Sequence, residues 1–232
     1  MPIDIETDVD VDIGTINELV RTLFGESAQT VDIVILLTIL TLLPSILMML
    51  TGFTRIIIVL SFIRQALGMQ QTPPNQILIG LALFLTFFVM QPVFSRVYDD
   101  AYVPFTEGAI TQEEFLDSAM EPIREFMIEQ AFDSDVAFFI GMAGEDYPDL
   151  ESLPNSVLIP AFITSEIKHA MFIGFIIYIP FIVIDMIVAS TLMSMGMMML
   201  PPAMISLPFK VLLFVMVDGW QLIIGSLIQT FY

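Results

Sequence analysis

Four long apolar segments constrain this chain more than any other feature of its sequence. They cover approximately residues 31–50, 76–97, 170–200 and 204–231. A helix of about 20 apolar residues spans the hydrocarbon core of a bilayer, so each segment is long enough to cross a membrane. Only 14% of all residues are charged, against about 25% in an ordinary soluble domain. The sequence therefore predicts an all-α, membrane-associated protein.

The acidic residues are concentrated in two regions outside the apolar segments. Eight of the 26 lie in residues 1–32 and sixteen in residues 99–166. A chain with this acidic balance has no electrostatic footprint for nucleic acid. The pattern predicts four regions: an acidic N-terminal tail (1–30), N-terminal apolar helical hairpins (31–97), an acidic helical insert (98–156), and C-terminal apolar helical hairpins with a methionine-rich loop (157–232).

The charges also predict an orientation and local structure for these regions. The connector 51–75 holds Arg55 and Arg64 and no acid, which places it on the cytoplasmic side and the acidic insert on the outer, periplasmic side. Helical spacing of apolar residues predicts an amphipathic helix over residues 113–132 and a shorter helix over 135–142. In the tail, residues 16–24 form one short amphipathic stretch, which is either a surface helix or disordered.

Five ionisable residues lie within or beside the apolar segments: Arg55, Arg64, Asp185, Lys210 and Asp218. Such groups are costly at membrane depth and normally face charged partners or a water-filled path. Lys210 and Asp218 share one side of a helix but lie two turns apart, so they cannot pair directly. Their partners must lie on other segments of the same chain or on other subunits, and the residues alone leave both alternatives open.

No catalytic, cofactor-binding or metal-binding motif is present in the sequence. Asp185 and Asp218 lack the Gly-x-Gly-Asp signature of intramembrane aspartyl proteases, and the chain has no cysteine. Its one histidine, His169, lies next to Lys168 and is typical of a helix surface. We therefore predict no enzyme, no cofactor and no metal. A stand-alone polytopic ion channel or transporter that uses Asp185 and Asp218 as relays remains the alternative function.

Several motifs, in order along about residues 33–231, resemble the FliP family of type III export-gate proteins. The C-terminal ones read TSEIK at 164–168, FIVIDMIVAS at 181–190, LMSMGMMML at 192–200, MISLPFK at 204–210 and VDGW at 217–220. The N-terminal ones read TRIIIVLSFIR at 54–64 and QTPPNQ at 71–76. The details are closer to the flagellar than to the virulence-type branch. Two departures are the missing signal peptide, since residues 1–12 are acidic, and the acidic stretch 131–135 where the family is more basic.

The resemblance implies the core pore-forming subunit of a flagellar export gate, with no catalysis of its own. Five copies would form a ring with one FliR, surrounded by FliQ and other membrane proteins of the export apparatus. Unfolded rod, hook and filament proteins would cross the inner membrane through it, in the flagellar basal body. The resemblance also implies that much of the chain lies above the bilayer on the periplasmic side. The apparent spans would then be kinked hairpins, broken near Thr51–Gly52, Pro160, Pro180 and Pro201–Pro202.

A ring changes the expectation for the embedded charges. Apolar helices with embedded charges can be buried against other subunits, where lipid does not reach them. We therefore expect Glu166, Lys168, Lys210 and Asp218 to pair mostly between subunits. Together with Asp185, Arg55 and Arg64 they form the predicted set of inter-subunit charges.

A cluster of methionines is the last feature that a ring would explain. As a continuous helix, Met193, Met195, Met197, Met198 and Met199 would point to every face, so no single packing stripe exists. Gly196 and the pair Pro201–Pro202 favour a bent loop instead. Methionine often fills irregular gaps in a core, which is the alternative explanation. In a ring, the loop would form a deformable gasket at the narrowest point of the pore.

Overall fold

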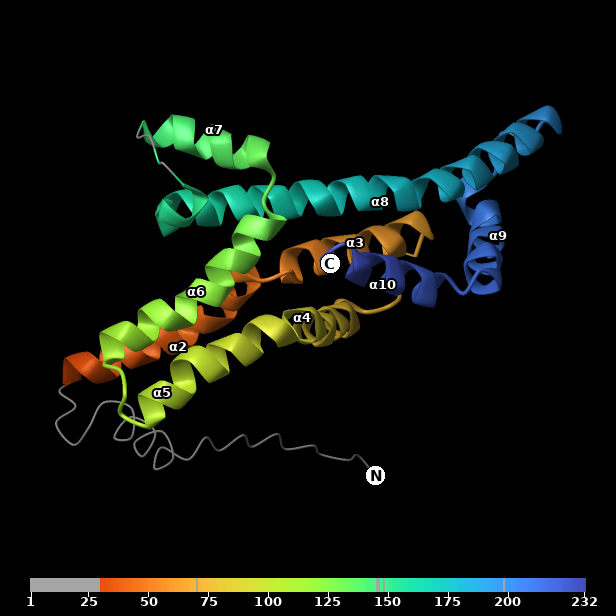
Figure 1. Cartoon of the computed structure of the whole chain (residues 1–232). Helices are drawn as coiled ribbons and strands as arrows, with labels where there is room; N and C mark the ends of the chain where they lie inside the picture. Colours follow the sequence, from red (N-terminus) through yellow and green to blue (C-terminus); the bar gives the residue numbers. More distant parts are fainter. Residues whose placement is uncertain (1–29, 70, 145–146, 148, 198) are drawn as a thin grey trace, which may run out of the picture. The chain divides into compact units, whose positions relative to one another are not determined.

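The computed structural model describes residues 30–69, 71–144, 147, 149–197 and 199–232 (Figure 1). The acidic tail and its amphipathic stretch at 16–24 lie outside these residues. Two compact units are separated at Leu47: Met1–Leu47 and Met48–Tyr232. In the first, the described residues belong to helix α2. The rest of the described structure belongs to the second unit.

Every regular element in the described part of the chain is helical, which confirms the all-α prediction. The helices are α2 (Thr30–Leu50), α3 (Phe53–Ala66), α4 (Asn75–Val97), the π-helix η1 (Tyr98–Tyr102), α5 (Val103–Thr106), α6 (Gln112–Gln130), α7 (Asp133–Ala143), the 3-10 helix η2 (Leu150–Ser152), α8 (Asn155–Ser194), α9 (Pro202–Met216) and α10 (Gly219–Gln229).

Two continuous helical stretches are long and apolar enough to cross a membrane, Asn75–Thr106 and Asn155–Ser194. The pairs α2 with α3 and α9 with α10 qualify only when each pair is taken as one bent span, and α9 and α10 meet at 65°. The described helices therefore allow two to four spans. The first stretch continues past residue 98, where the sequence predicted that the apolar segment ends and the acidic insert begins. The helix can continue because Ala101 is buried while Asp99 and Asp100 are exposed to solvent.

The helix breaks agree only in part with those expected from proline. Breaks occur at Thr51–Gly52 and before Pro202, as predicted. At Pro160 and Pro180 the prediction of breaks is wrong, because α8 continues through both residues. Each proline removes one backbone hydrogen-bond donor, but the helix continues without that bond. Figure 1 shows that α8 bends toward its C-terminal end. A further break, at Asp218 between α9 and α10, was not predicted.

The core of the second unit is built around α3, which packs against α8 more extensively than any other described pair of helices. One face of α3 is fully buried and faces apolar residues of α8 and α4. The two helices approach closely at Gly174, where an added Cβ atom would lie 2.4 Å from the Phe62 ring. Only glycine therefore fits there without moving a neighbour. The buried residues that form this contact include Ile56, Val59, Leu60, Ile63, Leu158, Phe162 and Ala170.

The two helices of the insert were predicted from sequence, and both are present. Helix α6 begins with a capping box, in which the Thr111 side chain accepts from the Glu114 backbone and the Glu114 carboxylate accepts from the Thr111 backbone N–H at 2.7 Å. The hydrogen bond from that backbone N–H holds the pKa of Glu114 below its usual value. Helix α6 packs on α4, η1 and α8, and α7 packs on α8. The insert is therefore attached along the first part of α8.

Candidate functional site

The methionine-rich loop joins α8 to α9 and begins with a hydrogen-bonded turn. The Gly196 N–H donates to Met193 O at 3.0 Å, and the Met197 N–H donates to Leu192 O at 3.0 Å. This pair of bonds is a Schellman motif, which needs a left-handed residue after the helix end, and Gly196 has φ +75. Helix α8 therefore ends at Ser194 because of this turn, and not because of the two prolines that follow.

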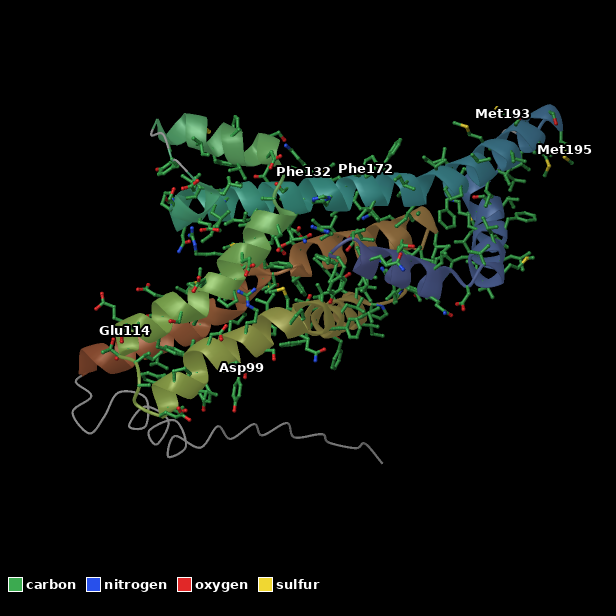
Figure 2. The ribbon with its side chains drawn as sticks, viewed as in Figure 1. Asp99, Glu114, Phe132, Phe172, Met193 and Met195 are labelled. Carbon is green, nitrogen blue, oxygen red and sulfur yellow. The ribbon has the colours of Figure 1, made fainter. Side chains whose placement is uncertain are left out.

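The side chains of this loop point away from the core of their own chain. Figure 2 shows Met193 and Met195 at the far end of α8. Met199 is 96% exposed, and Met198 lies outside the described residues. Gap filling inside the single chain therefore does not explain the described methionines of the loop, which are Met193, Met195, Met197 and Met199.

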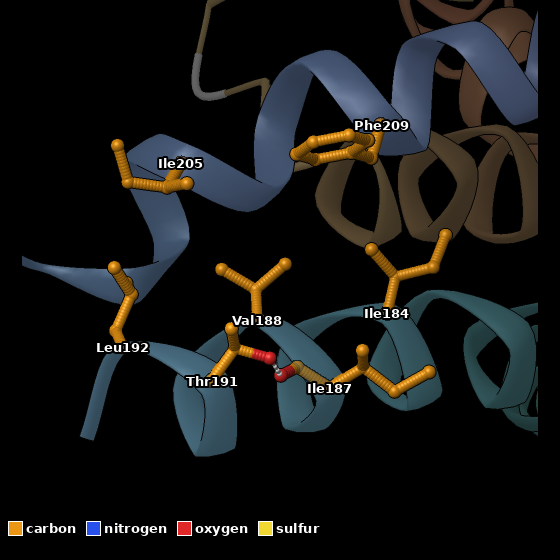
Figure 3. Close-up of a pocket in the computed structure, with 7 residues that line it drawn as sticks. All are labelled: Ile184, Ile187, Val188, Thr191, Leu192, Ile205 and Phe209. Atoms are coloured by element: carbon orange, nitrogen blue, oxygen red, sulfur yellow. Dashed lines mark hydrogen bonds between the residues drawn. The ribbon is translucent and has the colours of Figure 1, made fainter. Parts of the chain in front are cut away.

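Below the loop, α8 and α9 are held together by a charged pair and enclose an apolar groove. Lys210 Nζ donates to Asp185 Oδ2 at 2.6 Å, and Ser206 Oγ donates to Asp185 Oδ1 at 2.6 Å. The Lys210 side chain is buried and that of Asp185 is partly exposed. The groove has a volume of about 430 Å³ (Figure 3), and its lining comprises Ile184, Ile187, Val188, Thr191, Leu192, Ile205 and Phe209.

A fully buried arginine organises the opposite half of the second unit. Arg55 Nε donates to Glu166 Oε2 at 3.2 Å, and its Nη2 donates to Glu166 Oε1 and to Gln130 Oε1. Its Nη1 donates to the backbone and side-chain oxygens of Thr230 at 3.0 and 3.1 Å. The guanidinium lies 4.1 Å from the centre of the Phe231 ring. One side chain thus joins α3, α6, α8 and the residues after α10.

A second buried carboxylate attaches α7 to α8. Asp135 accepts hydrogen bonds from Lys168 Nζ and, at 2.8 Å, from Ser165 Oγ. Ser165 Oγ also accepts from the Phe132 N–H at 2.9 Å, just before α7 begins. The ring of His169 stacks on Phe132 with centres 4.1 Å apart. These contacts fix the start of α7 to one turn of α8.

Sequence comparison places these features in a known family. The FliP family model matches residues 36–227. The chain is 56% identical over 206 residues to the flagellar biosynthetic protein FliP of Pectobacterium carotovorum subsp. carotovorum, which covers 88% of this chain and 79% of that protein. The FliP of Bacillus subtilis is 54% identical over 205 residues, which are 88% of this chain and 93% of that protein. The FliP of Borreliella burgdorferi is 51% identical over 211 residues, which are 89% of this chain and 83% of that protein.

This chain belongs to the FliP family.

Membership confirms the resemblance and assigns the broad role of the chain. The chain is a membrane-associated, structural component of flagellar biosynthesis and protein export, and the family is not enzymatic. Among the described residues, no group of three or more His, Asp or Glu side chains could hold a metal ion. The features to be explained are therefore the exposed loop, the apolar surfaces and the charges.

Most of the predicted inter-subunit charges have partners within this FliP-family chain. Arg55 pairs with Glu166, Lys168 with Asp135, and Lys210 with Asp185. This is the alternative that the sequence left open. It could not be chosen from sequence because the partners are brought together only by packing of α3, α7 and α9 on α8. Several participants were missed altogether, since nothing in their local sequence marks them: Gln130, Phe132, Asp135, Ser165, Ser206, Thr230 and Phe231.

Two residues of the predicted set have no oppositely charged partner in the described chain. Arg64 donates to Asn75 Oδ1 and, at 3.3 Å, to Pro73 O, which are both neutral acceptors. Asp218 precedes α10 with a left-handed backbone at φ 50, and its side chain makes no capping hydrogen bond. For Asp218, pairing between subunits stays a prediction.

We expect the attachment of α7 to weaken in acid. Burial raises the pKa of Asp135, but the hydrogen bonds from Lys168 and Ser165 and the charge of Lys168 outweigh it, so the pKa lies below its ordinary value of 3.8. A lowered pKa contributes stability that is complete above the unfolded value and is lost as pH falls through the folded value. Hydrogen exchange of α7 amides, corrected for intrinsic rates, should therefore accelerate below about pH 4.

Substitutions on α7 separate this effect from a general loss of stability. Asp135→Asn should expose α7 to fast exchange at every pH and remove the acid-dependent step. Asp133→Asn changes an exposed acid on the same helix, so its exchange profile should match that of the unsubstituted chain. An unchanged acid-dependent step in Asp135→Asn would contradict the assignment.

Proposed function

We propose that this chain is a pore-forming subunit of the flagellar export gate, which conducts unfolded flagellar proteins across the bacterial inner membrane. Several copies, five by resemblance to the family, would form a ring with FliR- and FliQ-like partners and other membrane proteins of the export apparatus. The acidic insert would lie on the periplasmic side of the basal body. The observation that carries the proposal is the exposed methionine loop, held by a hydrogen-bonded turn at the end of a hairpin.

The stem and the tip of this hairpin have different mechanical properties. The stem is fixed by the bonds of Asp185 to Lys210 and Ser206, and its helix end is fixed by the Schellman turn at Gly196. Methionine is unbranched and can re-pack into irregular shapes at low cost. Copies of the loop arranged around one axis would therefore seal when empty and yield around varied unfolded chains. A dry apolar constriction also blocks ions, because water does not wet it.

Exposed apolar side chains beside the hairpin support a multi-subunit assembly. The exposed apolar residues of α8 and α9 include Met186, Ile187, Phe209 and Leu212, all more than half exposed. Apolar patches of this kind in single chains mark surfaces that other proteins or lipid cover. The relay alternative has less support, because Asp185 is already bonded to Lys210 and Ser206. Those contacts suit a structural role in the hairpin.

The gasket predicts a leak when the loop loses volume. We expect Met→Ala substitution at 193, 195, 197, 198 and 199 to raise small-ion permeability of cells or proteoliposomes that contain the assembled gate. Met→Leu at the same positions keeps the apolar volume and should stay much tighter. Permeability to ions and to small dyes, with and without an export substrate, gives the measurement.

Matched controls restrict the result to the loop. Met142 and Met171 are exposed to a similar degree but lie on α7 and in the middle of α8. Their substitution by Ala should leave permeability unchanged. Gates that assemble fully and stay tight with five alanines in the loop would disprove the gasket, while a chain that never joins a ring would disprove the pore itself.

A further inference from the structure

Asp218 is a carboxylate held in place by backbone bonds alone. It lies at the junction of α9 and α10 (Figure 1), where its N–H donates to Val215 O at 3.2 Å and its C=O accepts from the Leu222 N–H at 3.0 Å. Its side chain is exposed and makes no hydrogen bond or ion pair in the described chain. The junction therefore exposes a carboxylate that has no partner among the described residues.

The surroundings of this carboxylate are apolar and exposed. Val215, Met216 and Val217 precede it and Leu222 follows one turn later, and all four are at least half exposed. The two helices together are apolar enough to count as one bent span. A lone carboxylate on such a surface is costly once lipid or protein covers it, unless a cation comes with the covering surface. The covering surface must therefore supply a basic group.

Of the lysine and arginine residues in the described chain, only two have no carboxylate partner. Four others form ion pairs with acids of the same chain, namely Arg55, Arg96, Lys168 and Lys210. Arg124 lies in the insert and donates to neutral oxygens around η2. Arg64 remains, at the end of the apolar helix α3, and both of its bonds come from Nη1. Its Nε and Nη2 groups make no hydrogen bond in the described chain.

We propose that Asp218 of one copy pairs with Arg64 of the neighbouring copy. The inference rests on the proposed ring and names a contact that would fix how each copy is oriented relative to the next. A contact between two different surfaces of identical chains is heterologous, and it closes into a ring when the rotation between copies allows. Each interface would contain one such pair within an apolar surface. The free Nε and Nη2 groups of Arg64 could donate two parallel hydrogen bonds to the two oxygens of a carboxylate.

A cysteine pair tests this contact directly, because the full chain contains no cysteine. Two differently tagged copies, one with Asp218→Cys and one with Arg64→Cys, are expressed together with the other gate proteins and treated with a short bismaleimide. We expect a cross-linked product that carries both tags. Arg124→Cys in place of Arg64→Cys is the matched control and should give no such product.

A charge-removal cycle tests the energetics. Asp218→Asn keeps a residue that tolerates the left-handed backbone, and Arg64→Gln keeps a polar side chain. Each single change should weaken ring assembly by roughly 10-fold or more, and the double change should be no worse than the single ones.

The outcomes separate this pair from the proposed function. An intact ring on a native gel with no cross-link between tags, or with additive effects in the cycle, overturns the pair and leaves the ring. A cross-link that forms only between copies with the same tag overturns the pair as well. An unsubstituted chain that purifies as a monomer, with every gate protein present, overturns the ring and this contact together.

Discussion

Glu166→Ala should prevent the chain from accumulating in folded form. The substitution leaves the guanidinium of Arg55 buried without its counter-charge, since both side chains are fully buried. Removing one partner of a buried ion pair costs about 3–5 kcal/mol, which is a large part of the 5–15 kcal/mol that stabilises an ordinary domain. Thermal unfolding of the detergent-purified chain, and its abundance in membranes, give the measurement.

Two comparisons make this prediction specific. Replacing both residues, Arg55→Met with Glu166→Met, removes both charges and should recover much of the lost stability. Arg96 and Glu125 form a pair whose side chains are each 50% exposed, so Glu125→Ala should cost only about 0–1 kcal/mol. Equal effects of Glu166→Ala and Glu125→Ala would show that the buried pair is unimportant.

Gly174→Val should force α3 and α8 apart. Even a Cβ atom at this position would lie 2.4 Å from the Phe62 ring, and valine adds two further carbons to the same space. Overpacking of this kind typically costs about 1–3 kcal/mol. The same interface holds Arg55 against Glu166. We therefore expect a loss of stability at or above the upper end of this range, and a loss of motility in complemented cells.

Gly80→Ala is the matched control for this prediction. Gly80 also lies inside a long apolar helix, but an added Cβ atom there meets no other atom within 4 Å. Alanine is the better helix former by about 1 kcal/mol, so this change should be neutral or stabilising. A stability of Gly174→Val equal to that of Gly80→Ala would mean that the close approach of the helices can relax freely.

The sequence predicted the parts of this fold that depend on local pattern. Apolar runs marked the long helices, and amphipathic spacing marked α6 and α7, because burial of one face repeats along a helix. Proline was a poorer guide inside α8, where the helix continues past Pro160 and Pro180. There, packing of the apolar sides outweighs the loss of single backbone hydrogen bonds.

The candidate site was predictable to a similar extent. The methionine loop could be placed because Gly196 and Pro201–Pro202 are local signals for a turn. The charged residues could be identified, since ionisable groups stand out in apolar runs, but their partners could not. Asp135 lies 33 residues from Lys168, and Asp185 lies 25 residues from Lys210. Such pairs depend on tertiary packing, which no local pattern encodes.

The contacts of Arg55 also impose an order on the biosynthesis of the chain. A ribosome makes proteins from the N-terminus, and Arg55 precedes Glu166 by 111 residues and Thr230 by 175 residues. Its charge therefore leaves the ribosome long before Glu166, which neutralises it, is translated. Until then, the α3 segment must stay at a water-accessible position or with an insertion factor. Helix α3 can therefore reach its final packing only after both Glu166 and Thr230 have been translated.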